Sequence, residues 1–185
     1  MSDRTSTRQE LIAAAQQLVV DGGWEMVTTR RVAERAGVSP GLVHYHVGSI
    51  EGLRRAAACE GARNLLEGPF QEALEASNLR EGLLTFLLRL DLKPDYPGVV
   101  LLNEALVAAT HDAELRSDLA TMFSTFRARL AKRLAAQKGA HTEEAEARAL
   151  VLIAAVDGFL LQRALDPSLG AEQLVRGIEP FLEPQ

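Results

Sequence analysis

Hydroxyl and guanidinium side chains are concentrated in residues 28–39, near the N-terminus, and their chemistry suits nucleic-acid phosphates. The segment holds three arginines, and hydroxyl residues such as Thr29 and Ser39 stand near its two ends. Hydroxyls and the free backbone N–H groups at helix starts donate hydrogen bonds to phosphate oxygens. Guanidinium groups bind phosphates or the edges of bases. This combination indicates a surface that could contact the backbone of DNA.

Two short helices are predicted to position these side chains. The first begins around Thr28 or Thr29, where a hydroxyl can serve as N-cap, and ends at Gly37. The next starts at Ser39–Pro40, an N-cap followed by proline at the first helical position, and runs to about His46. A tight glycine-containing turn places the second helix across the first, as in a helix-turn-helix. The inward-packing residues are expected to be Val32, Ala33, Ala36 and Val38.

Residues 8–55 contain a series of short segments in a fixed order and spacing: residues 8–15, Val27–Thr29, Val32–Ala33, Ala36–Ser39, Tyr45–Val47 and Glu51–Leu53. In this order and spacing the chain resembles the N-terminal domain of TetR-type transcriptional regulators, the TetR/AcrR family. The resemblance implies a repressor that binds double-stranded operator DNA as a homodimer and is released by a small hydrophobic or amphipathic effector. In such a protein the second helix of the motif lies in the major groove of the DNA.

The resemblance also implies which residues contact DNA. By position, Thr29 would contact phosphate and Arg30 a phosphate or a base edge. The implied DNA-binding set is Thr29, Arg30, Ser39, Pro40, Gly41, Leu42, His44, Tyr45 and His46. Three residues depart from the family pattern: Leu42 replaces a common threonine, His44 a usual tyrosine, and Ile50 a lysine that often binds phosphate. They leave open the alternative of an interaction module that keeps the fold and does not read DNA.

Apolar residues recur at three-to-four spacing along almost the whole chain, and no alternating pattern predicts a strand. We expect an all-α fold, with a three-helix helix-turn-helix domain over residues 1–49 and a C-terminal helical bundle over residues 50–185. A fourth helix opens near Ser49, with Gly68–Pro69 as a kink or an end. The other expected helices span residues 5–20, 79–90, 96–110, 112–137, 142–165 and 171–182.

The resemblance assigns a ligand cavity to the C-terminal part, and helix 96–110 adds a hint of its own. The helix is apolar nearly all round, which predicts burial, but Asn103 and Glu104 interrupt it. A buried polar group needs a partner, which in a cavity can be a ligand. The candidate ligand-binding residues are Phe86, Leu90, Tyr96, Asn103, Glu104, Leu106, Met122, Phe126 and Phe159. The alternative is an ordinary core in which Glu104 pairs internally.

A dimer surface is predicted on the last two helices. Ala154 and Gly158 are four residues apart in the penultimate helix and would allow another helix to approach closely. Two helices from each subunit would form a four-helix interface. The candidate dimer residues are Leu150, Ile153, Ala154, Asp157, Gly158, Leu161, Leu165, Leu174, Ile178 and Phe181. Burial of the same residues within one subunit is the alternative.

The composition indicates a globular chain whose charge is unevenly distributed. The chain has 185 residues, 47% of them hydrophobic, which is enough for a packed core. The net charge is −5, but residues 1–60 hold seven arginines and seven acidic residues, so the negative charge lies in the remainder. A locally basic N-terminal face is therefore still possible. The lone Cys59 cannot form an internal disulfide and is expected to be a half-buried helix residue.

Several other classes of function lack a motif in this sequence. It shows no nucleophile elbow and no phosphate-binding glycine loop, so we expect neither an enzyme nor a cofactor. His44 and His46 point in different directions on a helix, so no metal site is expected. Apolar runs such as Val99–Leu102 are far shorter than the roughly 20 residues of a membrane span. The polar N-terminus lacks a secretory signal, so we expect a cytoplasmic protein without membrane contact.

Overall fold

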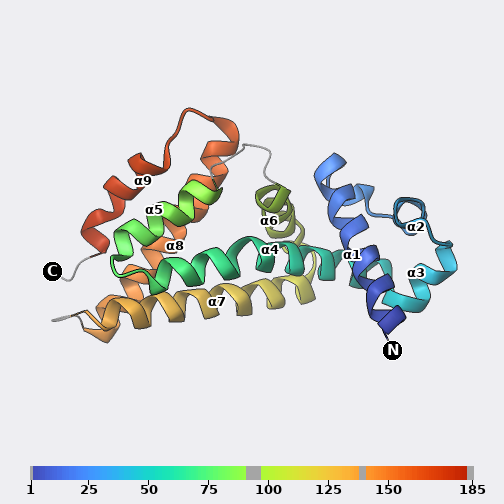
Figure 1. The fold of residues 1–185 in the computed structure, drawn as a ribbon, viewed down its shortest axis with the longest axis horizontal. Coiled ribbons are helices and arrows are strands. Elements are labelled where there is room, and N and C mark those ends of the chain that lie inside the picture. The colour runs from blue at the N-terminus through green and yellow to red at the C-terminus, as the bar shows by residue number, and fades with distance from the viewer. Residues whose placement is uncertain (1, 91–96, 138–140, 183–185) are drawn as a thin grey trace. The chain divides into compact units, whose positions relative to one another are not determined.

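The structure, a computed structural model, describes residues 2–90, 97–137 and 141–182, and all regular secondary structure in these ranges is helical (Figure 1). The predicted all-α fold is confirmed. The α-helices are α1 (Ser2–Gly22), α2 (Thr29–Ala36), α3 (Pro40–Val47), α4 (Ile50–Glu75), α5 (Leu79–Leu90), α6 (Pro97–Ala108), α7 (Ala113–Ala135), α8 (Thr142–Leu165) and α9 (Ala171–Ile178). Two short 3₁₀ helices, η1 (Trp24–Met26) and η2 (Glu179–Phe181), follow α1 and α9.

The chain forms two compact units that differ from the predicted division at residue 49. The first unit contains residues 1–65 and 97–119, and the second contains residues 66–96 and 120–185. The difference arises because α4 and α7 are long helices that each contribute one end to each unit. The start of α4, all of α6 and the start of α7 therefore belong with the helix-turn-helix.

The first unit has a continuous apolar core. One face of α1 supplies more of it than any other element, as its three-to-four spacing predicts. Helices α2, α3, α4 and α6 each bury apolar side chains against this face. The buried residues are Leu11, Ile12, Ala14, Ala15, Leu18, Val19, Val27, Val32, Ala33, Val43, Leu53, Ala57 and Leu101. The presence of Leu101 shows that α6 packs into the same core as the helix-turn-helix.

The second unit is a helical bundle in which α9 packs against α5 and α8 (Figure 1). Two arginines fix the ends of its elements. Arg133 of α7 donates hydrogen bonds to the carbonyls of Leu74 and Ala76, at 3.1 and 3.3 Å, where α4 ends. Arg148 of α8 is buried and donates to the carbonyl of Phe181 at 2.8 Å, which anchors η2.

Most helix boundaries follow the sequence signals, and two departures involve proline. Helix α4 continues through Gly68–Pro69 to Glu75, because buried side chains such as Phe70 and Ala73 hold the turns after the proline in the core. The last helix was expected to reach Leu182, but α9 ends at Ile178 and a 3₁₀ turn containing Pro180 follows. Proline lacks the N–H that an α-helix needs at that position.

Candidate DNA interface and ligand cavity

Local capping sets the geometry of the helix-turn-helix. The Thr28 hydroxyl accepts a hydrogen bond from the backbone N–H of Arg31 at 3.4 Å and caps α2. Gly37 ends α2 with a φ of 68°, in the left-handed region that favours glycine. Ser39 occupies the N-cap position of α3 with Pro40 next, as predicted, but the Ser39 side chain makes no capping hydrogen bond. The Ser39 hydroxyl is therefore not committed to its own helix.

Helix α3 buries only Val43 and leaves its outer face in solvent. Tyr45 is 62% exposed and Leu42 is 41% exposed, so both side chains are available for contact with a partner. His44 is also exposed and donates a hydrogen bond from Nδ1 to the carbonyl of Gly48 at 3.2 Å. The rings of Tyr45 and the half-buried His46 meet edge to face at 5.0 Å between centroids. Ser39, Pro40 and Gly41 are exposed at the start of the same helix.

The three arginines of α2 have different surroundings. Arg30 is exposed at the start of the helix, next to the half-buried Thr29. Arg35 forms an ion pair with Asp21 of α1, at 2.7 Å between Nη2 and Oδ2. Arg31 donates from Nη1 to the sulfur of Met26 at 2.6 Å. Arg35 therefore forms a contact within the unit, whereas the side chain of Arg30 is exposed to solvent.

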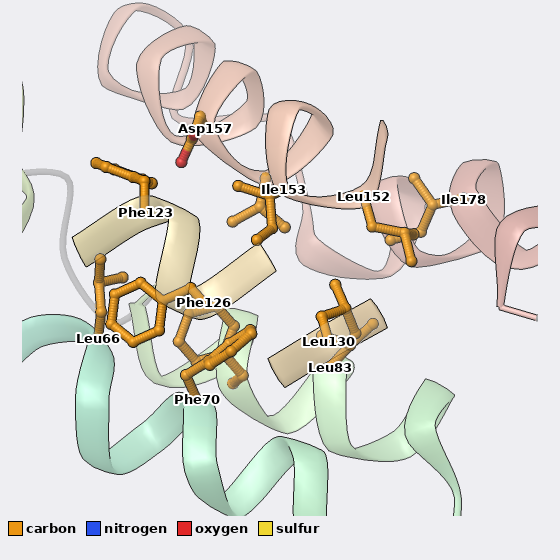
Figure 2. A pocket seen from close by; sticks show the side chains of 12 residues that line it. Leu66, Phe70, Leu83, Phe123, Phe126, Leu130, Leu152, Ile153, Asp157 and Ile178 are labelled. Atoms are coloured by element: carbon orange, nitrogen blue, oxygen red, sulfur yellow. The ribbon is translucent and has the colours of Figure 1, made fainter. Parts of the chain in front are cut away.

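A small apolar cavity lies inside the second unit (Figure 2). The free volume inside it is small, about 30 Å³, roughly that of one water molecule. Phe70 packs edge to face on Phe86 and Phe126, with centroids 5.9 and 5.2 Å apart. The lining residues come from α4, α5, α7, α8 and α9 and are Leu66, Phe70, Leu83, Phe86, Phe123, Phe126, Leu130, Leu152, Ile153, Val156, Asp157 and Ile178.

Asp157 is the one ionisable residue in this lining. Its burial among apolar side chains raises the pKa of the carboxyl group to about 6, an effect that the positive charge of Arg127 partly offsets. The carboxylate is ionised for the most part above that pH. The cavity thus combines phenylalanine rings with a single negative charge.

The predicted ligand residues are divided between the two units. Phe86 and Phe126 line the cavity. Phe159 is buried and Met122 half-buried, but neither lines it. Asn103, Glu104 and Leu106 belong to α6 in the first unit, where Leu106 is exposed. Tyr96 and the side chain of Leu90 lie outside the described residues.

Glu104 has a partner within its own unit. Its Oε2 accepts a hydrogen bond from the backbone N–H of Trp24 at 3.1 Å. This is the internal pairing that the sequence left open as an alternative. The sequence could not identify the partner, because it is a main-chain group 80 positions away.

The predicted dimer residues also separate into two groups. Leu150 and Leu161 are each 56% exposed and Leu165 is 83% exposed, and they follow one side of α8. Ala154 and Phe181 are exposed as well, whereas Gly158 and Leu174 are half-buried. Ile153, Asp157 and Ile178 instead line the cavity. On α8 this follows from helical geometry, since Ile153 and Asp157 are four residues apart and share a face.

Ten of the twelve cavity residues are absent from the predicted ligand set. Ile153, Asp157 and Ile178 belong to the predicted dimer set instead, and the other seven belong to neither set: Leu66, Phe70, Leu83, Phe123, Leu130, Leu152 and Val156. One signal could have identified Phe123, which stands three residues before Phe126 and so faces the same way on α7. Phe70 follows Gly68–Pro69, which was expected to be a kink or an end, and only the continuation of α4 brings Phe70 to the cavity.

Two other kinds of feature are absent from the described part of the chain. None of its helices is both long enough and apolar enough to span a bilayer. Within the same ranges, no three His, Cys, Asp or Glu side chains are grouped so that they could hold a metal ion. Cys59 is half-buried, and burial, with Asp118 adding to it, raises the pKa of its thiol.

The chain is similar in sequence to known transcriptional repressors. It is 36% identical over 63 residues to the HTH-type transcriptional repressor AcnR of Corynebacterium glutamicum, a match that covers 34% of each chain. The repressor of the same name from Corynebacterium efficiens is 36% identical over 62 residues, 34% of this chain and 33% of that protein. The matches therefore span about a third of the length of these relatives.

Solved structures share the fold over almost the whole chain. A transcriptional regulator from Streptomyces coelicolor has a TM-score of 0.80 at 24% identity, covering 96% of this chain and 99% of that one. GusR of Salmonella enterica has a TM-score of 0.78 at 24% identity, with coverages of 96% and 95%. A regulator from Saccharomonospora viridis, solved in complex with choline, has a TM-score of 0.76 at 18% identity, with 96% of each chain covered.

Two family models match different parts of the chain. The model for bacterial regulatory proteins of the tetR family matches residues 11–57, which include the helix-turn-helix. The model for the tetracyclin repressor-like C-terminal domain matches residues 74–183, more than half of the chain. These models describe transcription regulators and not enzymes. The chain therefore belongs to the TetR family of bacterial transcriptional regulators.

Proposed function

We propose that this regulator is a ligand-responsive repressor that binds double-stranded operator DNA as a homodimer. A small hydrophobic or amphipathic effector in the cavity of the second unit releases it from the DNA. The observation that carries the proposal is the outer face of α3, where Leu42, His44 and Tyr45 are exposed on a helix that is anchored by Val43.

The arrangement around α3 supports DNA binding. A helix with an exposed outer face and a buried inner face can enter the major groove without disturbing the core. The free Ser39 hydroxyl and the Arg30 guanidinium suit phosphate contacts at its edge. We propose Thr29, Arg30, Ser39, Pro40, Gly41, Leu42, His44, Tyr45 and His46 as the DNA-contacting set.

The exposed side of α8 supports a homodimer. Leu150, Leu161 and Leu165 place an apolar stripe in solvent, and the small Ala154 lies between them. Contiguous exposed apolar residues of this kind mark interaction surfaces. A second copy that presents the same stripe would bury it in a two-fold interface. Leu174 and Phe181 would extend the interface onto the last helices.

The cavity supports control by a ligand. An effector lowers the affinity for DNA only if it binds more tightly to a conformation that fits the operator less well. The small open volume means that side chains must move to admit it, so binding can favour a second conformation. A small amphipathic effector agrees with the choline bound by the Saccharomonospora viridis regulator.

Selection of DNA from a library of duplexes tests whether the chain binds operator DNA. The library is randomised over about 30 base pairs, enough for two half-sites separated by about one helical turn. The wild-type chain should enrich an inverted repeat, and the affinity for it should fall steeply as salt rises. Arg30→Ala should weaken binding about tenfold and reduce the salt dependence by about one released ion. Arg63→Ala, which removes an exposed arginine from α4, is the matched control.

A second variant and two possible outcomes of the selection complete the test of DNA binding. Tyr45→Ala should weaken binding to the enriched duplex while the protein remains folded. If no duplex is enriched, or if binding does not depend on salt, the DNA-binding role is wrong. If Arg30→Ala and Tyr45→Ala bind as the wild type does, α3 is not the contact surface, and an interaction module without DNA reading becomes the better description.

A further inference from the structure

A single carboxylate faces the apolar cavity of the second unit. Asp157 projects from α8, and in Figure 2 its oxygen end points toward the phenylalanine side chains on α7. Every other residue that lines the cavity is apolar. A cavity built only to receive hydrocarbon would not need this charge, because burying a carboxylate is costly.

The charge of Asp157 is not neutralised by a direct contact. Among the residues that the structure describes, none forms a hydrogen bond or an ion pair with its carboxylate. Arg127 of α7 attracts it at longer range only. Helices α4, α5 and α9 contribute only apolar side chains to the lining. Nothing from these elements competes for the carboxylate.

Two aromatic rings of the cavity lie near a guanidinium group that does not itself line the cavity. The guanidinium carbon of Arg129 lies 5.9 Å from the ring centroid of Phe70 and 5.9 Å from that of Phe126. The faces of aromatic rings bind cations through their quadrupole, most strongly when water is excluded. Phenylalanine rings beside an unpaired carboxylate therefore form a site that favours a positively charged group with an apolar body.

We propose that the cavity binds a small organic monocation, an alkyl or aryl ammonium, whose charge pairs with Asp157 and whose apolar part contacts Phe70, Phe86, Phe123 and Phe126. The inference rests on the proposed function, in which this cavity is the effector site. Size restricts the ligand further, because only about 30 Å³ is open before side chains move. Anions of the same shape would be repelled by the carboxylate, and neutral molecules would leave its charge uncompensated.

Matched pairs of ligands isolate the contribution of charge. The pairs are hexylamine with 1-hexanol, benzylamine with benzyl alcohol, and choline with 3,3-dimethyl-1-butanol, each a cation and a neutral molecule of similar shape. Calorimetric titration of the full chain at about pH 8 should give at least one cation that binds about tenfold or more tightly than its neutral partner. Lowering the pH to about 5 should weaken the binding of that cation, because Asp157 becomes protonated while the ligand stays charged.

Two variants test whether Asp157 is the source of the preference for cations. Asp157→Asn keeps the shape of the side chain and should abolish the preference for the cation. Glu146→Gln removes an exposed carboxylate from the same helix, outside the cavity, and should keep the preference. Circular dichroism and sedimentation of both variants verify the fold and the oligomeric state.

Several outcomes would overturn the inference. They are a wild type that prefers no cation over its neutral partner, a preference that survives in Asp157→Asn, and an Asp157→Asn variant whose only change is a weaker dimer. The proposed function fails separately. Cations that bind through Asp157 and leave the operator complex intact support this site and contradict its effector role. Release of the operator by the neutral members alone supports the effector role and contradicts the cation site.

Discussion

The Glu104 side chain accepts a hydrogen bond from the backbone N–H of Trp24, with 3.1 Å between Oε2 and N, and so ties α6 to the 3₁₀ turn after α1. A second contact holds the same turn, since Arg54 of α4 donates from Nε to the carbonyl of Val27 at 2.9 Å. The segment between α1 and α2 is therefore fixed by side chains from α4 and α6. A displacement of α6 away from this turn would break the Glu104 contact.

Removal of this contact should destabilise the first unit. We expect Glu104→Ala to lower the free energy of unfolding by about 1 kcal/mol, because the half-buried N–H of Trp24 loses its acceptor. Glu104→Gln keeps an acceptor oxygen and should recover most of the loss. Urea unfolding followed by Trp24 fluorescence measures both, with the exposed Glu67→Ala as control. Equal stability of the Ala and Gln variants would show that the bond contributes nothing.

Two glycines of the helix-turn-helix should respond in opposite ways to alanine. Gly37 has a φ of 68°, so Gly37→Ala should cost about 1 kcal/mol although no atom lies within 4 Å of the added Cβ. Gly41 is helical with the same free space, so Gly41→Ala should stabilise by about 0.5 kcal/mol. Thermal unfolding of the two variants and the wild type measures both changes in stability.

The Gly41 variant also tests the DNA contact. If Gly41 faces the groove as proposed, its alanine variant should bind the selected duplex more weakly despite its greater stability. Unchanged affinity would place Gly41 away from the DNA.

A charge on the exposed stripe of α8 should prevent dimer formation. Leu161→Glu introduces a carboxylate that would be buried without a partner in the proposed interface, so sedimentation should show a monomer. Leu88→Glu makes the same substitution at a leucine of α5 that is 45% exposed and off the stripe, and it should leave the dimer intact. A dimeric Leu161→Glu variant would exclude this side of α8 from the interface.

Asp157 should make the stability of the second unit depend on pH. Its pKa of about 6 in the folded chain is above the ordinary 3.8, so the folded state favours the protonated form and loses stability as the carboxyl ionises. Asp157→Asn should therefore raise Tm above pH 6, and the gain should shrink as pH falls from about 6 toward 4. A gain that is the same at pH 8 and pH 4 would show that ionisation is not its cause.

The local structure of this protein could be predicted from short sequence signals. Caps and breakers such as Thr28, Gly37 and Ser39–Pro40 act over a few residues, so they identify the helix-turn-helix without knowledge of the rest of the fold. Helices α5 and α8 have the predicted bounds for the same reason. The family resemblance of residues 8–55 rests on these signals and is confirmed by the family match over residues 11–57.

The tertiary structure alone decided which side chains meet. Glu104 is a polar interruption in an apolar helix in the sequence, and only packing of α6 on α1 supplies the N–H of Trp24. Asp157 lies on α8 close to the exposed stripe, and the rotation of that helix against its neighbours directs it to the cavity. Periodicity predicts which residues share a helix face, but the contacts of that face depend on helices distant in sequence.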